Sequence, residues 1–344
     1  MRPRKSAPHF KIASETAAIV TSLGTLLMSA CEASSPSSAD VNGSEAHAPR
    51  VIYDNDEVID VYTDDYVMAL AGASRIELIG MVTSSTTEPF NRWVSQEDLR
   101  RMREDRATGI AAARAIGVTG IPDPVGGPDR HLVPPESGHI GDTEPIGSVG
   151  SRLVVETAET LPAGAVLHMV MGGPLTLAAD AFLLEPSIVD RVVVHWLGGR
   201  QDDMADYNGW ADPWAAHIVL QRLKLIQYPA WQLGKRGAPS VPKRRLENLP
   251  DTPWSSWMVS KQHPTNPLPD ERDADAPPAI GLVRPDYVIA QKRVSFGGWS
   301  EGTGSSPPLL REDPEGSAVV VLGGDRDAAT EEWWRTILAA MAHP

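Results

Sequence analysis

Residues 50–82 read RVIYDNDEVIDVYTDDYVMALAGASRIELIGMV, and this stretch decides the fold. Residues 50–53 form a short apolar segment that runs directly into acidic residues. Residues 65–73 have helical character, and residues 76–82 form a second apolar segment. A strand, an acidic loop, a helix and a further strand within about 35 residues predict one βαβ unit.

The same succession recurs along the chain. We expect further strands at 165–170, 191–197 and 318–322, and further helices at 174–184, 213–223 and 328–341. Strands that alternate with helices predict a doubly wound, mostly parallel sheet with helices on both faces, in a single large α/β domain. Ligands of such sheets bind in the loops at the carboxyl ends of the strands. Residues 229–275 are rich in proline and tryptophan and lack this periodicity, so we expect an excursion over the strand ends.

Composition excludes several classes of protein. The chain has 31 Lys and Arg against 45 Asp and Glu, a net charge of −14, and no basic cluster that could bind a phosphate backbone. Nucleic acid is therefore not expected as a partner. No apolar run reaches the ~18 residues of a membrane-spanning helix, which excludes a polytopic membrane protein. The single cysteine cannot form a disulfide or a thiolate metal site within one chain.

That cysteine, Cys31, follows an N-terminal segment with the pattern of an export signal. A basic start precedes a short apolar stretch at residues 16–30, and small residues precede the expected cleavage point. The sequence LMSAC at residues 27–31 resembles a bacterial lipoprotein box, in which the cysteine is lipidated and becomes the new N-terminus. The alternative is an ordinary cleaved signal in which Cys31 is incidental.

We therefore expect a signal peptide at residues 1–30, a flexible tether at 31–48 and the α/β domain at 49–344. The tether residues are small and polar and show no periodicity, as in flexible linkers. The predicted location is the bacterial cell envelope, with the exported protein anchored to the membrane through lipidated Cys31.

Five aspartates follow the first strand within twelve residues: Asp54, Asp56, Asp60, Asp64 and Asp65. These charges would repel one another strongly unless a cation lies among them. A hard cation with oxygen ligands, Ca²⁺ or Mg²⁺, is one remedy. In the other interpretation Asp64 caps the following helix and the remaining carboxylates face water. The position directly after the first strand of the sheet favours the metal.

Four segments resemble, in the same order, those of the inosine/uridine-type nucleoside hydrolases. The family opens with Asp-x-Asp-Pro-Gly-x-Asp-Asp-Ala-x-Ala-Leu and continues with Gly-Pro-Leu-Thr-Asn, Met-Gly-Gly and Glu-Phe-Asn-x-x-x-Asp-Pro-Glu-Ala-Ala, before a late aspartate. The matching segments are DND at 54–56 with DDYVMAL at 64–70, GPLT at 173–176, LGG at 197–199 and DYNGWADPWAA at 206–216, followed by Asp275. The resemblance covers the chain from about residue 50 to residue 344.

The resemblance implies hydrolysis of the N-glycosidic bond of nucleosides or related ribosides, with Ca²⁺ as the cofactor and Asp56 as the base that takes a proton from the attacking water. It also implies a homodimer or homotetramer, since family members commonly assemble in this way. The calcium ligands that it implies are Asp56, Asp65, the backbone carbonyl of Thr176, and Asp275. The sugar contacts that it implies are Asp64 and Asn208 at the 2′- and 3′-hydroxyls, Asp206 at the 5′-hydroxyl, and Thr87 in place of an asparagine.

The sequence also departs from the family pattern. Asp56 and Asp64 are eight residues apart, where the family spacing is four. Ala274 stands where many members have a histidine that is credited with protonating the leaving base, a contribution worth ~10²–10⁴-fold in rate. His195, at the end of a predicted strand, is a candidate replacement for this acid. In the other interpretation His195 is a packed core residue.

Two functional hypotheses follow. The first is a Ca²⁺-dependent hydrolase that releases a base and ribose. The second is a catalytically inactive module of the same fold that binds a sugar or glycan at the cell envelope. Retention of Asp206, Asn208 and Asp275 favours the enzyme, whereas Ala274 and the lengthened acidic loop favour the binding module.

Overall fold

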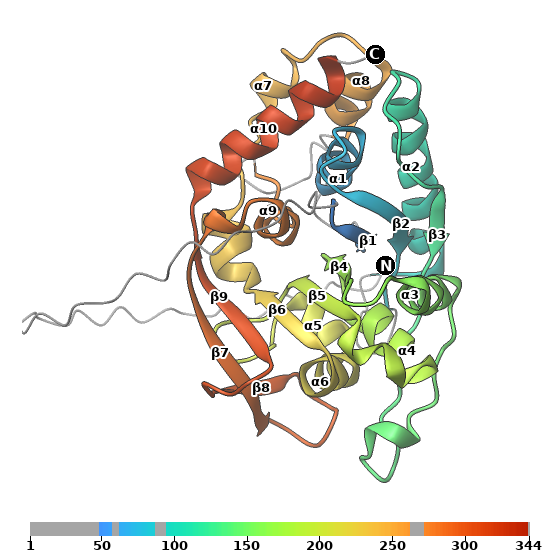
Figure 1. Cartoon of the computed structure of the whole chain (residues 1–344), viewed down its shortest axis with the longest axis vertical. Helices are drawn as coiled ribbons and strands as arrows, with labels where there is room; N and C mark the ends of the chain where they lie inside the picture. The colour runs from blue at the N-terminus through green and yellow to red at the C-terminus, as the bar shows by residue number, and fades with distance from the viewer. Residues whose placement is uncertain (1–47, 57–61, 87–93, 262–271, 343–344) are drawn as a thin grey trace, which may run out of the picture. The chain divides into compact units, whose positions relative to one another are not determined.

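A nine-stranded sheet organises the folded part of the chain (Figure 1). The computed structural model describes residues 48–56, 62–86, 94–261 and 272–342, so the division into signal peptide, tether and domain stays a prediction. The strands are β1 (Arg50–Asp54), β2 (Glu77–Thr83), β3 (Pro124–Gly126), β4 (Leu167–Met171), β5 (Val192–Leu197), β6 (Lys224–Tyr228), β7 (Val288–Trp299), β8 (Pro308–Glu312) and β9 (Ala318–Gly324). Their order in the sheet is β3-β2-β1-β4-β5-β6-β9-β7-β8.

The sheet is mostly parallel, as the alternation of strands and helices predicts. The pairings from β3 to β9 in this order are parallel, and β7 pairs antiparallel with both β9 and β8. The helices are α1 (Thr63–Gly72), α2 (Gln96–Arg114), α3 (Val149–Thr160), α4 (Thr176–Leu184), α5 (Tyr207–Ala211), α6 (Pro213–Arg222), α7 (Lys243–Leu246), α8 (Pro253–Ser260), α9 (Pro277–Val283) and α10 (Arg326–Ala342). Four short helical turns complete the described elements: η1 (Ile140–Asp142), η2 (Pro186–Asp190), η3 (Ala230–Gly237) and η4 (Pro285–Tyr287).

Helices cover both faces of the sheet, which confirms the predicted doubly wound architecture. Alternate residues of a strand point to opposite faces. In β1, Val51 and Tyr53 therefore join a core formed with α1, α9 and α10, whereas Ile52 joins a second core formed with α3, α4 and α6. Both cores consist of buried apolar side chains. The interior strands contribute side chains to both cores, so their sequences are continuously hydrophobic.

Some elements escape sequence prediction. Helices α2 and α3 and the antiparallel pair β7–β8 are not among the predicted elements. Part of the 229–275 excursion is regular, because η3, α7 and α8 lie within it. None of the helices that the structure describes is long and apolar enough to cross a membrane.

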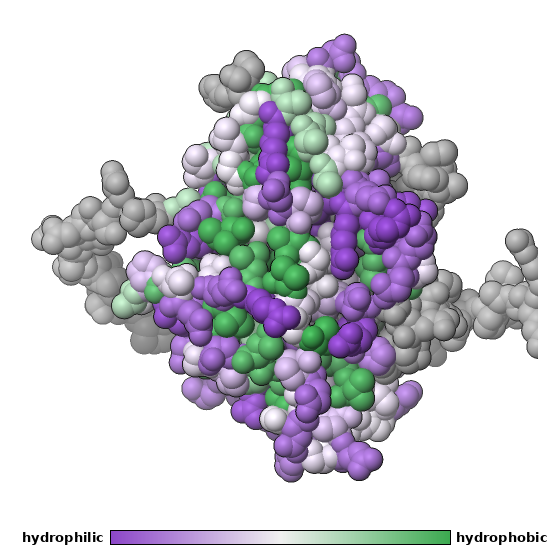
Figure 2. Space-filling view, turned by 90° about the vertical axis from the view of Figure 1, so that its right-hand side faces the viewer, coloured by the Kyte–Doolittle hydropathy of each residue, from purple (hydrophilic) through white to green (hydrophobic). Residues whose placement is uncertain are grey.

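Helix α2 lies along one side of the sheet and exposes a charged surface. Arg100 pairs with Glu97 and Glu104 on the solvent side of this helix. Figure 2 views that side of the molecule and shows hydrophilic side chains interspersed with hydrophobic ones. The opposite face of α2 is buried and includes Arg106, a residue that is important for the site described below.

The register of the central strands brings three loops to one edge of the sheet. Asp54, the last residue of β1, lies opposite Met171 at the end of β4 and Val82 near the end of β2. Met171 in turn lies opposite Trp196 of β5. The segments that follow β1, β4 and β5 therefore meet at the carboxyl edge, where doubly wound sheets bind their ligands.

A buried carboxylate stabilises the loop that enters α3. Asp180 of α4 is fully buried and accepts hydrogen bonds from the backbone N–H groups of Ile146 (2.6 Å), Gly147 (3.0 Å) and Ser148 (3.3 Å). The hydroxyl of Ser151 donates a further hydrogen bond at 2.5 Å. One side chain thus satisfies backbone donors that would otherwise be buried without partners.

We expect Asp180→Ala to lower the free energy of unfolding by roughly 3 kcal/mol or more, because it leaves several buried N–H groups unsatisfied. Urea unfolding of the purified protein measures this loss. Asp190→Ala is the matched control, since the Asp190 side chain is 87% exposed, and it should change the stability by less than about 0.5 kcal/mol. Equal effects of the two substitutions would contradict the role assigned to Asp180.

Candidate active site

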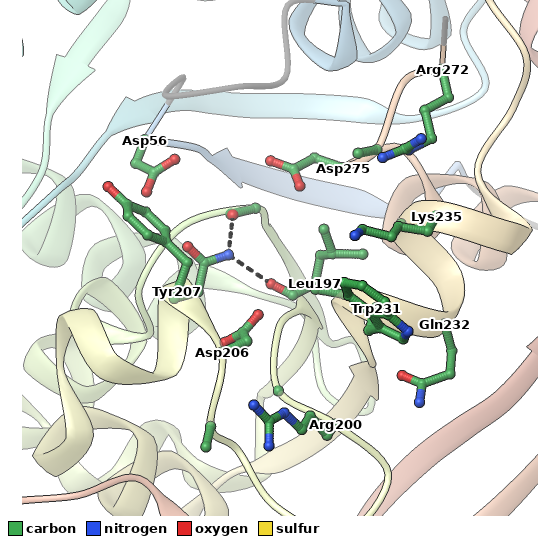
Figure 3. Close-up of a pocket in the computed structure, with 17 residues that line it drawn as sticks. Asp56, Leu197, Arg200, Asp206, Tyr207, Trp231, Gln232, Lys235, Arg272 and Asp275 are labelled. Carbon is green, nitrogen blue, oxygen red and sulfur yellow. Dashed lines mark hydrogen bonds between the residues drawn. The ribbon is translucent and has the colours of Figure 1, made fainter. Parts of the chain in front are cut away.

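A cavity of about 660 Å³ opens at the carboxyl edge of the sheet (Figure 3). Its walls come from the residues after β1, β4 and β5, from α5 and η3, and from the segment before α9. The size is typical of sites for small molecules. The charged residues of its lining are three carboxylates, Asp56, Asp206 and Asp275, and three cations, Arg200, Lys235 and Arg272.

Asp56 and Asp275 approach the end of β4 from two different segments, and both line the cavity. Two glycines make this approach feasible. A Cβ on Gly172 would lie 2.5 Å from Oδ2 of Asp275, and a Cβ on Gly173 would lie 3.2 Å from the Cβ of Asp56. Any larger residue at either position would displace a carboxylate. The structure therefore brings together two of the predicted site residues that are far apart in the sequence.

Asn208 presents only an acceptor to the cavity. Its Nδ2 donates to the carbonyl oxygens of Gly172 (2.6 Å) and Leu197 (3.0 Å), shown as dashed lines in Figure 3. Both N–H groups of the amide are thereby used, so the side-chain oxygen is the atom left for a ligand. The residue after it must be glycine, since a Cβ on Gly209 would lie 1.7 Å from the carbonyl oxygen of Met204.

Asp206 begins α5 and faces the cavity beside Asn208. Its Oδ1 accepts a hydrogen bond from the backbone N–H of Gly209 at 2.8 Å. Burial raises the pKa of Asp206 to about 6, although N–H groups of Gly199 and Gly209 and the charge of Arg200 oppose the increase. The structure thus places Asp206 and Asn208 as the sequence predicts, with two acceptors aimed at one cavity.

Asp64, predicted to bind a sugar hydroxyl, lies against an arginine and is not part of the cavity lining. Arg106 donates from Nε to Oδ2 of Asp64 at 2.9 Å and from a terminal nitrogen to Oδ1 at 3.0 Å. The same guanidinium donates to the hydroxyl of Thr83 at 2.7 Å and to the carbonyl of Val82. The interpretation of Asp64 as a helix cap is wrong, because the side chain is buried against Arg106 and α1 has no side-chain cap hydrogen bond.

A sequence signal for Arg106 exists in hindsight. The buried residues of α2 are Leu99, Arg106, Gly109, Ile110 and Ala113, which recur with helical spacing. Arg106 is therefore on the apolar face of an otherwise charged helix. A lone arginine on such a face indicates a buried carboxylate partner, because a buried charge needs an ion pair.

Asp65, a predicted calcium ligand, also faces away from the cavity. It is fully buried, and its Oδ1 accepts a hydrogen bond from the indole N–H of Trp254 at 2.6 Å. The ammonium of Lys261 lies 3.8 Å from Oδ2. Burial raises the pKa of Asp65 to about 6, although the charge of Lys261 and the hydrogen bond from Trp254 oppose this.

The cavity lining includes only two of the four predicted calcium ligands. Asp56 and Asp275 line the cavity, but Asp65 and Thr176 do not. Thr176 is the first residue of α4, and its hydroxyl donates to Asp212 at 2.8 Å. Within the described ranges, no three Asp, Glu, His or Cys side chains are grouped so that they could hold a metal. The side chains of Asp56, Asp65 and Asp275 therefore do not form the three-carboxylate part of the calcium site that the resemblance implies.

His195, the predicted replacement acid, lies in the sheet and not in the cavity lining. Its Nε2 is 3.1 Å from Nδ1 of His168, and its ring stacks near Tyr228. Burial, with a smaller contribution from the His168 charge, lowers the pKa of His195 to about 3, so the imidazole is neutral at physiological pH. The core interpretation of His195 agrees with this placement. Thr87 lies outside the described residues.

Ala274 lines the cavity, and its methyl group cannot donate the proton that the family histidine at this position is expected to give to the leaving base. Its Cβ would lie 3.8 Å from a Cβ on Gly234 of η3. The cations that line the cavity, Arg200, Lys235 and Arg272, were not predicted. Lys235 of η3 holds its ammonium 3.3 Å from the ring centroid of Trp231, which fixes it above that ring. Sequence periodicity could not find Lys235, because η3 lies in the aperiodic excursion.

Because the pKa of Asp206 is raised, we expect the free energy of unfolding to depend on pH through this residue. A carboxyl whose pKa is raised on folding stabilises the protein below its ordinary pKa, 3.8, and loses that contribution as the pH rises through about 6. Since Asp206 is only half-buried, we expect Asp206→Asn to reduce the loss of unfolding free energy between about pH 4.5 and pH 7.5 by roughly 1–2 kcal/mol.

Urea unfolding at both pH values measures this difference. Asp202→Asn serves as the control, because that side chain is 85% exposed. A pH dependence in Asp206→Asn equal to that of the parent protein would show that Asp206 has an ordinary pKa.

Solved structures with this arrangement of strands and helices are nucleoside hydrolases. The inosine-uridine preferring nucleoside hydrolase from Bacillus anthracis aligns with a TM-score of 0.56 at 13% identity, covering 84% of this chain and 99% of that one. A plant nucleoside hydrolase aligns with a TM-score of 0.59 at 16% identity, covering 85% and 99%. The purine-preferring ribonucleoside hydrolase from Gardnerella vaginalis gives 0.55 at 17% identity, covering 85% and 99%. No protein-family model and no curated protein sequence matches the chain. By its architecture, the chain has the nucleoside hydrolase fold.

Proposed function

We propose that the cavity binds a nucleoside or a related riboside and hydrolyses its N-glycosidic bond, giving a base and ribose. The observation that carries this proposal is the convergence of Asp56, Asp275, Asp206 and Asn208 on one cavity at the carboxyl edge of a nucleoside hydrolase fold. These residues come from three segments that the sequence resemblance identifies independently, since Asp206 and Asn208 share one of them. Fold alone would not support an activity, so the side chains of the site carry the argument.

The carboxylates of the cavity suit the charge that develops during the reaction. Cleavage of the glycosidic bond gives the sugar oxocarbenium character, and fixed negative groups nearby stabilise that positive charge. Asp56, on the segment that directly follows β1, is the base that accepts a proton from the attacking water. Asp275, whose Oδ2 lies beside Gly172, lines the same cavity and adds negative charge there.

Asn208 and Asp206 recognise the sugar. The oxygen of Asn208 and the carboxylate of Asp206 both accept hydrogen bonds, and ribose hydroxyls are the matching donors. Because the Asn208 amide is fixed by two backbone carbonyls, its oxygen needs no reorientation when a sugar binds. A ribose ring with free hydroxyls is thus the part of the substrate that the described residues fit best.

The reaction that we propose contains no calcium-dependent step. Calcium dependence would require Asp65 among the ligands, and this carboxylate is held by Trp254 and Lys261 instead. The site also has alanine at position 274, so none of the described lining residues is a histidine that could protonate a leaving base. Substrates whose leaving groups depart without protonation should therefore react fastest.

A sugar-binding module without turnover is the second candidate. It is favoured by Ala274 and by the ion pairs that occupy Asp64 and Asp65, since these residues then cannot take part in catalysis. Sugar recognition by Asn208 and Asp206 would remain in such a module. The two candidates differ in ribose release and agree in ribose binding.

We expect the purified protein to release ribose from p-nitrophenyl riboside at least about 100-fold faster than from inosine or uridine, because p-nitrophenolate needs no general acid. Asp56→Asn should lower the rate by a factor of about 10²–10⁴, since the amide cannot accept the proton. Ribose is quantified with each substrate at matched enzyme concentrations.

Asp190→Asn, an exposed site away from the cavity, should retain the parent rate. Absence of release from all three substrates, together with calorimetric binding of ribose that Asn208→Leu abolishes, would replace the hydrolase with the binding module. Equal rates for Asp56→Asn and the parent protein would remove Asp56 from the mechanism.

We also propose that the mature protein is anchored at the bacterial cell envelope through lipidated Cys31 and that it forms a homodimer or homotetramer. The first part is supported by the lipoprotein-like segment at residues 27–31. When the full chain is expressed in a bacterium, it should fractionate with membranes, and Cys31→Ala should shift it to the soluble fraction. Parent and variant both in the soluble fraction would indicate an ordinary cleaved signal. Light scattering of the purified protein gives the number of subunits.

A further inference from the structure

Two adjacent carboxylates at the start of α1 are buried and need compensating charge. Asp64 is 3% exposed and Asp65 is fully buried. Buried charges persist only when they are paired and hydrogen-bonded. The bidentate ion pair with Arg106 provides this for Asp64, so the remaining question is which cation neutralises Asp65.

Helix α8 provides the partners of Asp65. Trp254 is in its first turn and Lys261 caps its last turn, seven residues later, so both side chains project from the same side of the helix. Trp254 donates its indole N–H to Oδ1 at 2.6 Å, and Lys261 places its ammonium 3.8 Å from Oδ2. Oδ1 thus accepts a hydrogen bond from α8, whereas Oδ2 faces the ammonium of the same helix at ion-pair distance.

The Lys261 side chain is held in this position. It is only 13% exposed, and its ammonium lies 5.1 Å from the ring centroid of Trp257. That tryptophan packs against α2, where a Cβ on Gly109 would lie 2.7 Å from the indole nitrogen. Helix α8 is thereby fixed against the body of the domain, and the lysine is directed at the aspartate.

We propose that Lys261 is the built-in counter-ion of Asp65, so that the protein neutralises this carboxylate with its own ammonium and not with a divalent metal. A calcium ion requires carboxylate oxygens at about 2.3–2.6 Å. Such an ion on Asp65 would compete with the Trp254 N–H for Oδ1 and would be repelled by the ammonium beside Oδ2. The adjacent carboxylates Asp64 and Asp65 are then balanced by cations from α2 and α8, within the chain itself.

The proposal concerns the same site as the proposed hydrolase but does not depend on turnover. Measurements of metal binding and of thermal stability test the proposal, and neither measurement uses ribose release. A hydrolase that requires calcium would refute this inference and leave the proposed function standing. A protein with neither ribose release nor calcium binding would refute the function and leave this inference standing.

The first measurement is calorimetric titration of the chelator-treated protein with Ca²⁺. We expect no saturable heat up to millimolar Ca²⁺, and an apparent Tm that is the same with Ca²⁺ and with chelator. Stoichiometric binding of Ca²⁺ at micromolar concentrations by the parent protein would overturn the proposal.

The second measurement compares lysine variants. Lys261→Met removes the ammonium, keeps a similar side-chain volume and leaves a buried carboxylate without its counter-ion, so the apparent Tm should fall by about 5–10 °C. Lys243→Met is the matched control. Its ammonium is also 3.8 Å from a carboxylate, that of Glu247, but both side chains are about half exposed. We expect a change of at most about 1 °C in this control.

The double variant Asp65→Asn/Lys261→Met separates charge pairing from packing. It removes both charges, so it should recover at least half of the Tm lost in Lys261→Met. If Lys261→Met alone fails to fold but the double variant folds, this result would support the proposal equally. A double variant no more stable than Lys261→Met, or a Lys261→Met variant as stable as the Lys243→Met control, would show that Lys261 does not act through Asp65.

Discussion

The buried ion pair between Arg106 and Asp64 is the interaction on which the carboxyl edge of the sheet depends. One guanidinium connects three elements, because it joins the first turn of α1 to α2 and to the end of β2. Removal of either partner would leave an isolated charge in a fully buried position, which is far more costly than loss of an exposed pair. The position of α2, and with it the packing of α8, therefore follows from a charge that the acidic loop creates.

These pairings also determine which carboxylates are available for chemistry. Asp64 and Asp65 are adjacent in sequence to the predicted site, yet both are directed at protein donors and neither lines the cavity. Asp56, Asp206 and Asp275 remain in the cavity, from three separate segments. Proximity in sequence to a motif thus does not establish membership of a site. The direction and the ion-pair partner of each side chain decide it, because Asp64 and Asp65 face Arg106 and Lys261 and not the cavity.

The sequence predicts the parts of this fold that depend on local pattern. Alternating apolar segments identify the central strands and their helices, because both faces of the sheet are covered and the strands are continuously hydrophobic. Motif order also locates the cavity residues Asp56, Asn208 and Asp275. The pattern fails where the partner is remote. Arg106 and Asp64 are 42 residues apart and Trp254 and Asp65 are 189 apart, and no local spacing reports such a pairing. Strand β7 was missed for another reason, since it lies near the sheet edge and alternates little between buried and exposed residues.

The distribution of charge across the cavity follows from the same electrostatic constraint. Three carboxylates that line one cavity repel one another, and nearby cations reduce this repulsion. Arg200 lowers the pKa of Asp206 against the effect of burial, and Lys235 and Arg272 line the wall beyond it. Guanidinium and ammonium groups thus offset the carboxylate charge in the cavity lining, as Arg106 and Lys261 offset the charge of Asp64 and Asp65 outside it. The acidic loop required cations, as its composition indicates, and the chain supplies them from helices and loops that the motif does not include.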